Sequence, residues 1–167
     1  MTYCPSMPLV TTPYQDVTVL DLTHEFGRYV GRLFADLGAT TIRVEPPDGL
    51  PDRVRMARAP SPEATAAFTF LNASKKSTVI DLADAAGLVE FAELARRASV
   101  ILVEAGGPLF DDLAQLRKMA GPRAILTSIS PYGRAGPRAH DPASDLVLQA
   151  AGGIAWLSGR PDAPPLR

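Results

Sequence analysis

Apolar and polar positions follow two different periods along the chain, and residues 18–47 show the change between them most clearly. Thr18–Asp21 and Thr40–Val44 are short β-branched and apolar runs, each leading to an acidic residue, as is typical of strands. Between them, apolar residues recur at helical spacing: Tyr29, Val30, Leu33, Phe34 and Leu37. Gly38 stands where a helix ends in a left-handed residue, and the tight connection that follows predicts two parallel strands.

The same alternation continues to residue 152. After a Pro- and Arg-rich loop at 46–62, the pattern predicts helices over 64–71, 85–97, 111–120 and from Asp141 to Gly152, with strands over 78–82, 99–103 and 123–130. Asp84 and Asp141 stand at helix N-cap positions, and Pro142 follows at a first helical position. Such alternation predicts an α/β domain with a mainly parallel sheet and helices on both faces.

Composition narrows the classes of function. Lys and Arg number 17 against 18 Asp and Glu, a formal net charge of -1, so no global field attracts nucleic acid or an anionic membrane. No apolar stretch approaches the roughly 20 residues that cross a bilayer, so no membrane partner is expected. The single cysteine, Cys4, cannot form an internal disulfide, which favours the reducing cytoplasm.

Ligands of such sheets bind beyond the carboxyl ends of the strands. That rule points to residues 21–28, 45–58, 104–108 and 130–138. The first segment has only Gly27 and Gly31 in place of a G-x-G-x-x-G fingerprint, so a nicotinamide enzyme is not expected. No Walker loop exists, and one cysteine with two histidines makes a metal site unexpected. Ser130 lies outside any G-x-S-x-G elbow, so a serine hydrolase has no support.

Five segments carry a family resemblance in order and spacing: VLDLTHEFGRYVGRLFADLGATTIRVEPP, NASKKSTVIDLAD, ASVILVEAG, ILTSISPYGRAGP and SDLVLQAAGGIAWLSGRPDAPP. They resemble the N-terminal part of the family III CoA-transferases, which include carnitine, formyl-CoA and succinyl-CoA-dependent transferases and the α-methylacyl-CoA racemases. The resemblance implies a Rossmann-like domain over 17–160. Residues 1–16 are then expected to be a flexible N-terminal segment, and 161–167 a truncated connection toward a second domain.

The resemblance also implies a reaction. Family III transferases move CoA between carboxylic acids through an aspartate that forms an anhydride and then a thioester with CoA, so the implied partners are an acyl-CoA and a carboxylic acid acceptor. That aspartate follows a G-x-P-x-x-P-P segment, so it is expected beyond Arg167, and this chain alone is expected to be inactive. Family members form interlinked dimers, which implies a homodimer or a complementary C-terminal segment.

Implied contacts with coenzyme A follow from matching positions. Lys75 and Lys76 match N-x-x-K/R-K/R-S, and their ammonium groups either meet the 3′-phosphate or pyrophosphate of CoA or form a solvated basic pair. Arg43 matches a basic family position, where a structural role is the alternative. Tyr132 and Gly133 lie in the loop after the last strand and either contact the ligand or pack. No catalytic residue and no metal are assigned.

Departures from the family pattern keep two other functions open. The family usually has V-E-N-F-x-P-G where residues 103–108 read VEAGGP, and a small residue with Gly-Pro where this chain has Phe26-Gly27-Arg28. These losses favour a non-catalytic module that binds CoA, another nucleotide or a protein partner. An acyl-CoA racemase relative is the second alternative, but Ser144 replaces the histidine that racemases place before Asp145. Asp145 is expected to be a first-turn helix acid.

Overall fold

The computed structural model describes residues 11–53, 62–107, 109–110 and 112–160. It divides into two compact units, Met1–Ile129 and Ser130–Arg167, and each is described by itself. Cys4, most of the N-terminal segment 1–16, the C-terminal segment 161–167, and Arg55 and Arg58 of the Arg-rich loop lie outside the described residues. Within those residues, no helix is both long and apolar enough to cross a bilayer.

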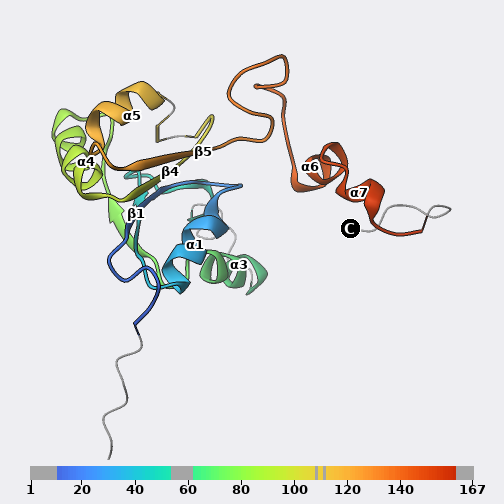
Figure 1. Cartoon of the computed structure of the whole chain (residues 1–167), viewed down its shortest axis with the longest axis horizontal. Helices are drawn as coiled ribbons and strands as arrows, with labels where there is room; N and C mark the ends of the chain where they lie inside the picture. The colour runs from blue at the N-terminus through green and yellow to red at the C-terminus, as the bar shows by residue number, and fades with distance from the viewer. Residues whose placement is uncertain (1–10, 54–61, 108, 111, 161–167) are drawn as a thin grey trace, which may run out of the picture. The chain divides into compact units, whose positions relative to one another are not determined.

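Five parallel strands form the centre of the first unit (Figure 1). In chain order they are β1 (Thr18–Leu22), β2 (Thr40–Glu45), β3 (Lys76–Val79), β4 (Val100–Glu104) and β5 (Ile125–Ile129). Their order in the sheet is β3-β2-β1-β4-β5, with Val19 level with Thr41 on one side and with Val100 on the other. The predicted α/β class and parallel sheet are confirmed. The strand order reverses direction between β1 and β4, the position at which doubly wound sheets bind ligands.

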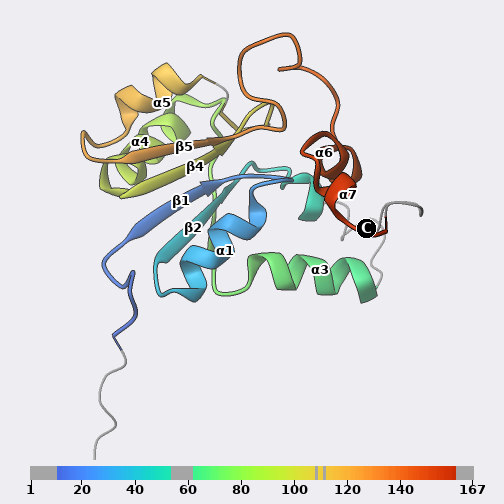
Figure 2. The ribbon, with the colours of Figure 1, turned by 45° about the vertical axis from the view of Figure 1, so that its right-hand side comes forward.

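Helices cover both faces of this sheet. α1 (Arg28–Asp36) and α3 (Pro62–Asn72) lie on one face, and α4 (Ala85–Arg97) and α5 (Leu113–Met119) lie on the other (Figure 2). The Asp84 side chain caps α4 by accepting a hydrogen bond from Ala86 N at 3.1 Å, as predicted. Gly38, with φ +96°, ends α1 in the predicted left-handed conformation.

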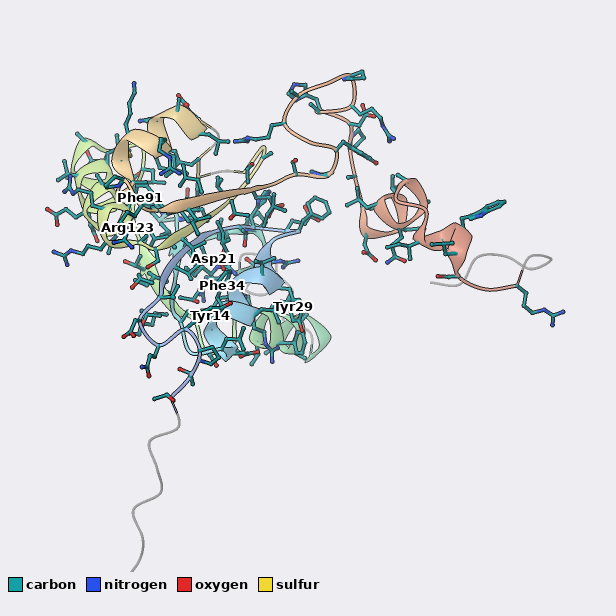
Figure 3. All side chains as sticks on the ribbon, viewed as in Figure 1. Tyr14, Asp21, Tyr29, Phe34, Phe91 and Arg123 are labelled. Atoms are coloured by element: carbon teal, nitrogen blue, oxygen red, sulfur yellow. The ribbon has the colours of Figure 1, made fainter. Side chains whose placement is uncertain are left out.

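Alternation along the strands divides the apolar core in two. Leu20 and Leu22 of β1 pack with Phe91 of α4 in the larger cluster, whereas Val19 packs with the α1 side chain Phe34 in the smaller one. Figure 3 shows Phe91 and Phe34 on opposite sides of the sheet. It follows that Asp21, which alternates with Leu20 and Leu22, lies on the face that α1 covers.

Two predictions for the first unit, the buried face of α1 and the bounds of the third strand, differ from the structure. The predicted apolar face of α1 is wrong in part, because Tyr29, Leu33 and Leu37 are exposed and the buried residues are Gly31 and Ala35. Small residues let the helix axis approach β1 closely, and that contact sets the rotation of the helix. The third strand spans Lys76–Val79 rather than 78–82, because it pairs with the carboxyl half of β2 and stops where β2 stops.

The second unit contains α6 (Asp145–Ala151) and α7 (Ile154–Leu157). The predicted N-cap Asp141 is wrong: Ser144 caps α6 by accepting from Val147 N at 3.4 Å. The Asp141 carboxylate instead accepts from Arg138 Nε at 3.0 Å, and the backbone remains non-helical up to Ser144. Asp145 lies in the first turn of α6, as predicted, and accepts from Gln149 Nε2.

Candidate functional site

Buried polar side chains gather where the strands end. Among the described residues, four charged residues of the strands are no more than 1 % exposed: Asp21 of β1, Arg43 and Glu45 of β2, and Glu104 of β4. By alternation, all four lie on the face that α1 covers, at the carboxyl ends of neighbouring strands. Buried charges require specific partners, and the partners divide this cluster into three parts.

The first part joins Asp21 to Lys75 beneath α1. Lys75 Nζ donates to Asp21 Oδ2 and to the carbonyl oxygen of Arg28, both at 2.7 Å. The other carboxylate oxygen of Asp21 accepts from the backbone N–H and hydroxyl of Thr23 at 3.0 and 2.6 Å. Burial lowers the pKa of the Lys75 ammonium below its usual 10.5, and the charge of Asp21 opposes that change. Lys75 therefore fixes the start of α1 to β1.

The second part is a network of arginines and carboxylates around β2. Arg43 donates to Asp52 Oδ1 at 2.6 Å and to the side-chain oxygen of Asn72. Arg53 holds Glu45 with two bonds of 2.6 and 2.7 Å, the paired geometry that suits guanidinium and carboxylate. Burial alone would raise the pKa of Glu45, but bonds from Arg53 and other neighbours outweigh it, so that this pKa lies below 4.5.

The third part surrounds Glu104 at the end of β4. Its carboxylate accepts backbone N–H bonds from His24, Glu25 and Phe26 at 3.0 Å each and from Gly27 at 3.3 Å. The His24 Nδ1 atom lies 3.3 Å from Glu104 Oε2. Burial raises the pKa of Glu104, but the His24 side chain and the backbone donors outweigh it and lower the pKa from 4.5 to about 2.

A pocket of about 420 Å³ opens beside Glu45 at the carboxyl ends of β2 and β3. Among the described residues that line it, Arg53 is the cation, with a side chain 43 % exposed, and Pro46 and Val79 contribute apolar surface. The remaining lining residues are Glu45, Pro47, Asp48, Gly49 and Ser77. Two N–H groups of the Arg53 guanidinium hold Glu45, and its remaining donors can meet an anion, while the apolar residues can contact a ring.

The predicted site residues fall into three environments. Arg43 and Lys75 are brought together, since both donate to Asn72 Oδ1, and both are held within the protein. Lys76 is exposed at the first position of β3, and alternation with Ser77, which bonds Glu45, places Lys76 on the opposite face. The adjacent lysines therefore point to different faces of the sheet.

Tyr132 and Gly133 belong to the second unit. The guanidinium of Arg138 lies 4.0 Å from the centre of the Tyr132 ring, and Gly133 has φ +88°. Nothing in the chain tests their predicted contact with CoA, or that of the other three residues, so all five assignments stay predictions.

Sequence reasoning placed Asp21, Asp52 and Glu104 within the segments expected to face a ligand, but it did not name them as site residues. A signal was present for two of them, because β1 and β4 are apolar runs that end in or near an acidic residue. A carboxylate at the end of a buried strand must be neutralised by a neighbour. Asp52 carried no such signal. In the described part of the chain, no three His, Cys, Asp or Glu residues are grouped so as to hold a metal ion.

The parallel sheet, the strand order and the polar cluster at the switch point define an α/β domain of the Rossmann type. The chain belongs to CoA-transferase family III, whose family model matches residues 14–167. The resemblance seen in the five sequence segments is thus confirmed.

Characterised relatives are CoA-transferases. The chain is 36 % identical over 163 residues to the acetyl-CoA:oxalate CoA-transferase of Acetobacter aceti, covering 93 % of this chain and 41 % of that protein. It is 36 % identical over 156 residues to the BbsE subunit of the succinyl-CoA:(R)-benzylsuccinate CoA-transferase of Thauera aromatica, covering 89 % and 38 %. A CAIB/BAIF family protein from Brucella suis has a TM-score of 0.75 at 29 % identity, over 93 % of this chain and 43 % of that one. The chain spans about two fifths of the length of these relatives.

Proposed function

We propose that this chain is the N-terminal, CoA-binding part of an acyl-CoA transferase that moves CoA between carboxylic acids. The observation that carries the proposal is the family match over residues 14–167 together with relatives at 36 % identity that are CoA-transferases. The acyl donor and acceptor differ among these relatives, so the proposal extends to the class of reaction and not to one pair of acids.

The proposed chemistry is covalent transfer through an aspartate supplied outside residues 1–167. Its carboxylate attacks the thioester carbon and the C–S bond breaks. This step releases CoA as a thiolate and forms a mixed anhydride between the aspartate and the first acid. The thiolate then attacks the aspartyl carbonyl and releases the first acid, which leaves an aspartyl thioester. The acceptor carboxylate then attacks the aspartyl thioester, which releases the CoA thiolate and forms a second anhydride. The thiolate attacks the acyl carbon of the acceptor, which gives the new acyl-CoA and frees the aspartate, so no net proton or electron is consumed. The residues of this chain serve binding and positioning.

We assign the nucleotide end of CoA to the pocket beside Glu45, which lies at the carboxyl ends of β2 and β3. Arg53 supplies an accessible guanidinium for a phosphate, and Val79 and Pro46 supply an apolar wall for the adenine ring. Arg43 and Lys75 support this edge from within through their internal bonds. Lys76 is the exposed lysine of the predicted pair and is tested separately.

Calorimetric titration of the 167-residue chain with CoA tests the proposal. We expect heat of binding at CoA concentrations up to millimolar, and an affinity about fivefold weaker in Arg53→Gln, since loss of one phosphate contact costs on the order of 1 kcal/mol. Lys118→Gln, in the last turn of α5, is the matched control. A folded chain that gives no heat at millimolar CoA would rule CoA binding out. Normal affinity in both Arg53→Gln and Lys76→Gln would place the nucleotide elsewhere.

A non-catalytic module is the second candidate. The observation that favours it is the sequence at Phe26 and at Ala105-Gly106, where family side chains that line the CoA site are replaced. A transfer assay discriminates between the two candidates. The chain is supplied with a segment that carries an aspartate soon after Pro165, and transfer of labelled CoA from one acid to another is measured. If the chain is part of a transferase, the label is exchanged. A non-catalytic module binds its ligand and exchanges none.

A further inference from the structure

Four consecutive backbone N–H groups in the turn before α1 converge on one side chain. His24, Glu25, Phe26 and Gly27 all donate to the carboxylate of Glu104, at 3.0 to 3.3 Å. That carboxylate comes from a strand about eighty residues further along the chain and is 1 % exposed. These backbone donors hold the buried carboxylate in the way they would hold a bound anion, although it is covalently part of the chain.

The position of this turn gives the contact its meaning. Converging N–H groups just before a helix are the arrangement with which α/β proteins bind phosphate. The turn also lies at the switch point of the strand order, where Rossmann-type sheets place the phosphates of a ligand. Here Glu104 occupies the donors that a phosphate would use.

The register of the sheet explains how Glu104 reaches the turn. Leu22 of β1 is level with Val103 of β4, so Glu104 ends its strand beside the residues that follow β1. The turn is also packed from behind. A Cβ atom at Gly27 would lie 2.4 Å from Thr23 Cγ2 and 2.7 Å from Ile129 Cδ1, so the backbone cannot retreat to make room for a larger anion without displacing its neighbours.

We propose that Glu104 is the positioning residue of this turn: a built-in anion that fixes the backbone of residues 24–27 and keeps phosphate groups out. The inference rests on the geometry of the turn and does not depend on the proposed function. If the chain binds CoA, its phosphates bind away from this turn.

Chemical rescue of Glu104→Ala tests the inference, because the atoms removed by this substitution have the size and charge of acetate. In chloride buffer we expect the melting temperature of the full chain to fall by roughly 10 °C, since four backbone donors lose a buried acceptor. About 100 mM acetate should recover at least about 3 °C of that loss. Acetamide, which is neutral, should recover none, and wild type should respond equally to acetate and chloride.

The matched control is Glu45→Ala, which removes a buried carboxylate bonded by the side chains of Arg53 and Ser77 instead of by backbone donors. Arg53, whose side chain is 43 % exposed, can turn to water once released, whereas Arg43, whose Nε lies 3.7 Å from Glu45 Oε1, stays buried, so acetate should rescue this variant less than it rescues Glu104→Ala. Equal rescue of both variants, or equal rescue by acetamide, would overturn the inference. If Glu104→Ala is unfolded in chloride, helical circular dichroism after refolding in acetate or chloride is the readout, and equal recovery in both is the contrary result.

Inorganic phosphate tests the exclusion of phosphate. At matched ionic strength, phosphate should raise the melting temperature of Glu104→Ala more than that of wild type, because only the variant has free donors in the turn. An equal or larger rise in wild type would show that phosphate is not kept out of the protein by Glu104, and would overturn that part of the inference.

Discussion

At the scale of single residues, three carboxylates at the ends of strands are neutralised in three different ways. Glu104 is held by backbone N–H groups, Glu45 by Arg53 and Ser77, and Asp21 by Lys75 and Thr23. A buried charge that loses its partner typically costs 3–5 kcal/mol. Each of these contacts therefore also fixes the loop or helix that supplies the partner, which is how the ligand edge of the sheet keeps its shape.

Glu104 should make folding stability depend on acid pH. Its pKa falls from 4.5 in the unfolded chain to about 2 in the folded one, and tenfold in an acid constant corresponds to about 1.4 kcal/mol. The carboxylate therefore contributes on the order of 3 kcal/mol above pH 4.5, and this contribution is lost as the pH falls from 4.5 towards 2.

Urea unfolding of wild type and Glu104→Gln between pH 3 and 7 measures that effect. The difference between the two free energies of unfolding should be largest near neutral pH and should shrink as the pH falls below 4.5. Glu45 and Asp52, whose pKa values are also lowered, remain in both proteins and cancel in the comparison. A difference independent of pH would contradict the lowered pKa of Glu104.

At the scale of elements, the contact between α1 and β1 decides the geometry of the site. Gly31 faces Asp21 so closely that a Cβ atom would lie 2.2 Å from Asp21 Oδ2 and 3.2 Å from Lys75 Cε. A larger residue would push α1 away from the sheet or separate Asp21 from Lys75. The helix can therefore cover a buried ion pair only because residue 31 has no side chain.

Gly31→Ala should destabilise the protein, which is the reverse of the usual effect of this change in a helix. Alanine is ordinarily favoured by about 1 kcal/mol, but here the steric conflict should give a net loss of roughly 1–3 kcal/mol. The midpoint of urea denaturation measures the sign. Ala66→Gly, at an exposed position of α3, measures the effect of the difference in helix propensity between alanine and glycine without a steric conflict. A higher midpoint for Gly31→Ala would show that α1 can shift without cost.

The sequence predicted elements better than it predicted contacts. α4 was predicted to the residue because a regular apolar period and an N-cap agree at Asp84. The buried face of α1 was not predicted correctly, because five apolar residues cover too wide an arc of the helix to mark one face. The close approach of Gly31 and Ala35 to the sheet determines which face is buried. Arg43 and Lys75 were recognised as site residues, but their internal partners were not. Glu104 contacts the turn only because β4 lies beside β1, and the order of strands in a sheet cannot be predicted from the local sequence.

At the scale of the whole molecule, the two helices of the second unit present apolar side chains that the described part of this unit does not bury. Neither α6 nor α7 has a buried residue, and the exposed apolar side chains include Leu146, Ile154, Leu157 and Trp156, of which the last is 90 % exposed. Soluble proteins seldom expose such side chains together unless another surface covers them. The predicted homodimer or complementary segment would provide that cover.

We expect the 167-residue chain to self-associate, and Trp156→Ser to weaken that association at least about tenfold, because a tryptophan buried at the centre of an interface commonly contributes 2 kcal/mol or more. Val89→Ser, which removes an exposed apolar side chain of α4, should have little effect. Sedimentation gives the affinity. Trp156 is the single tryptophan of the chain, so its emission should move to shorter wavelength as the protein concentration rises. A dispersed monomer whose emission stays constant with concentration would mean that the helices of the second unit need no partner.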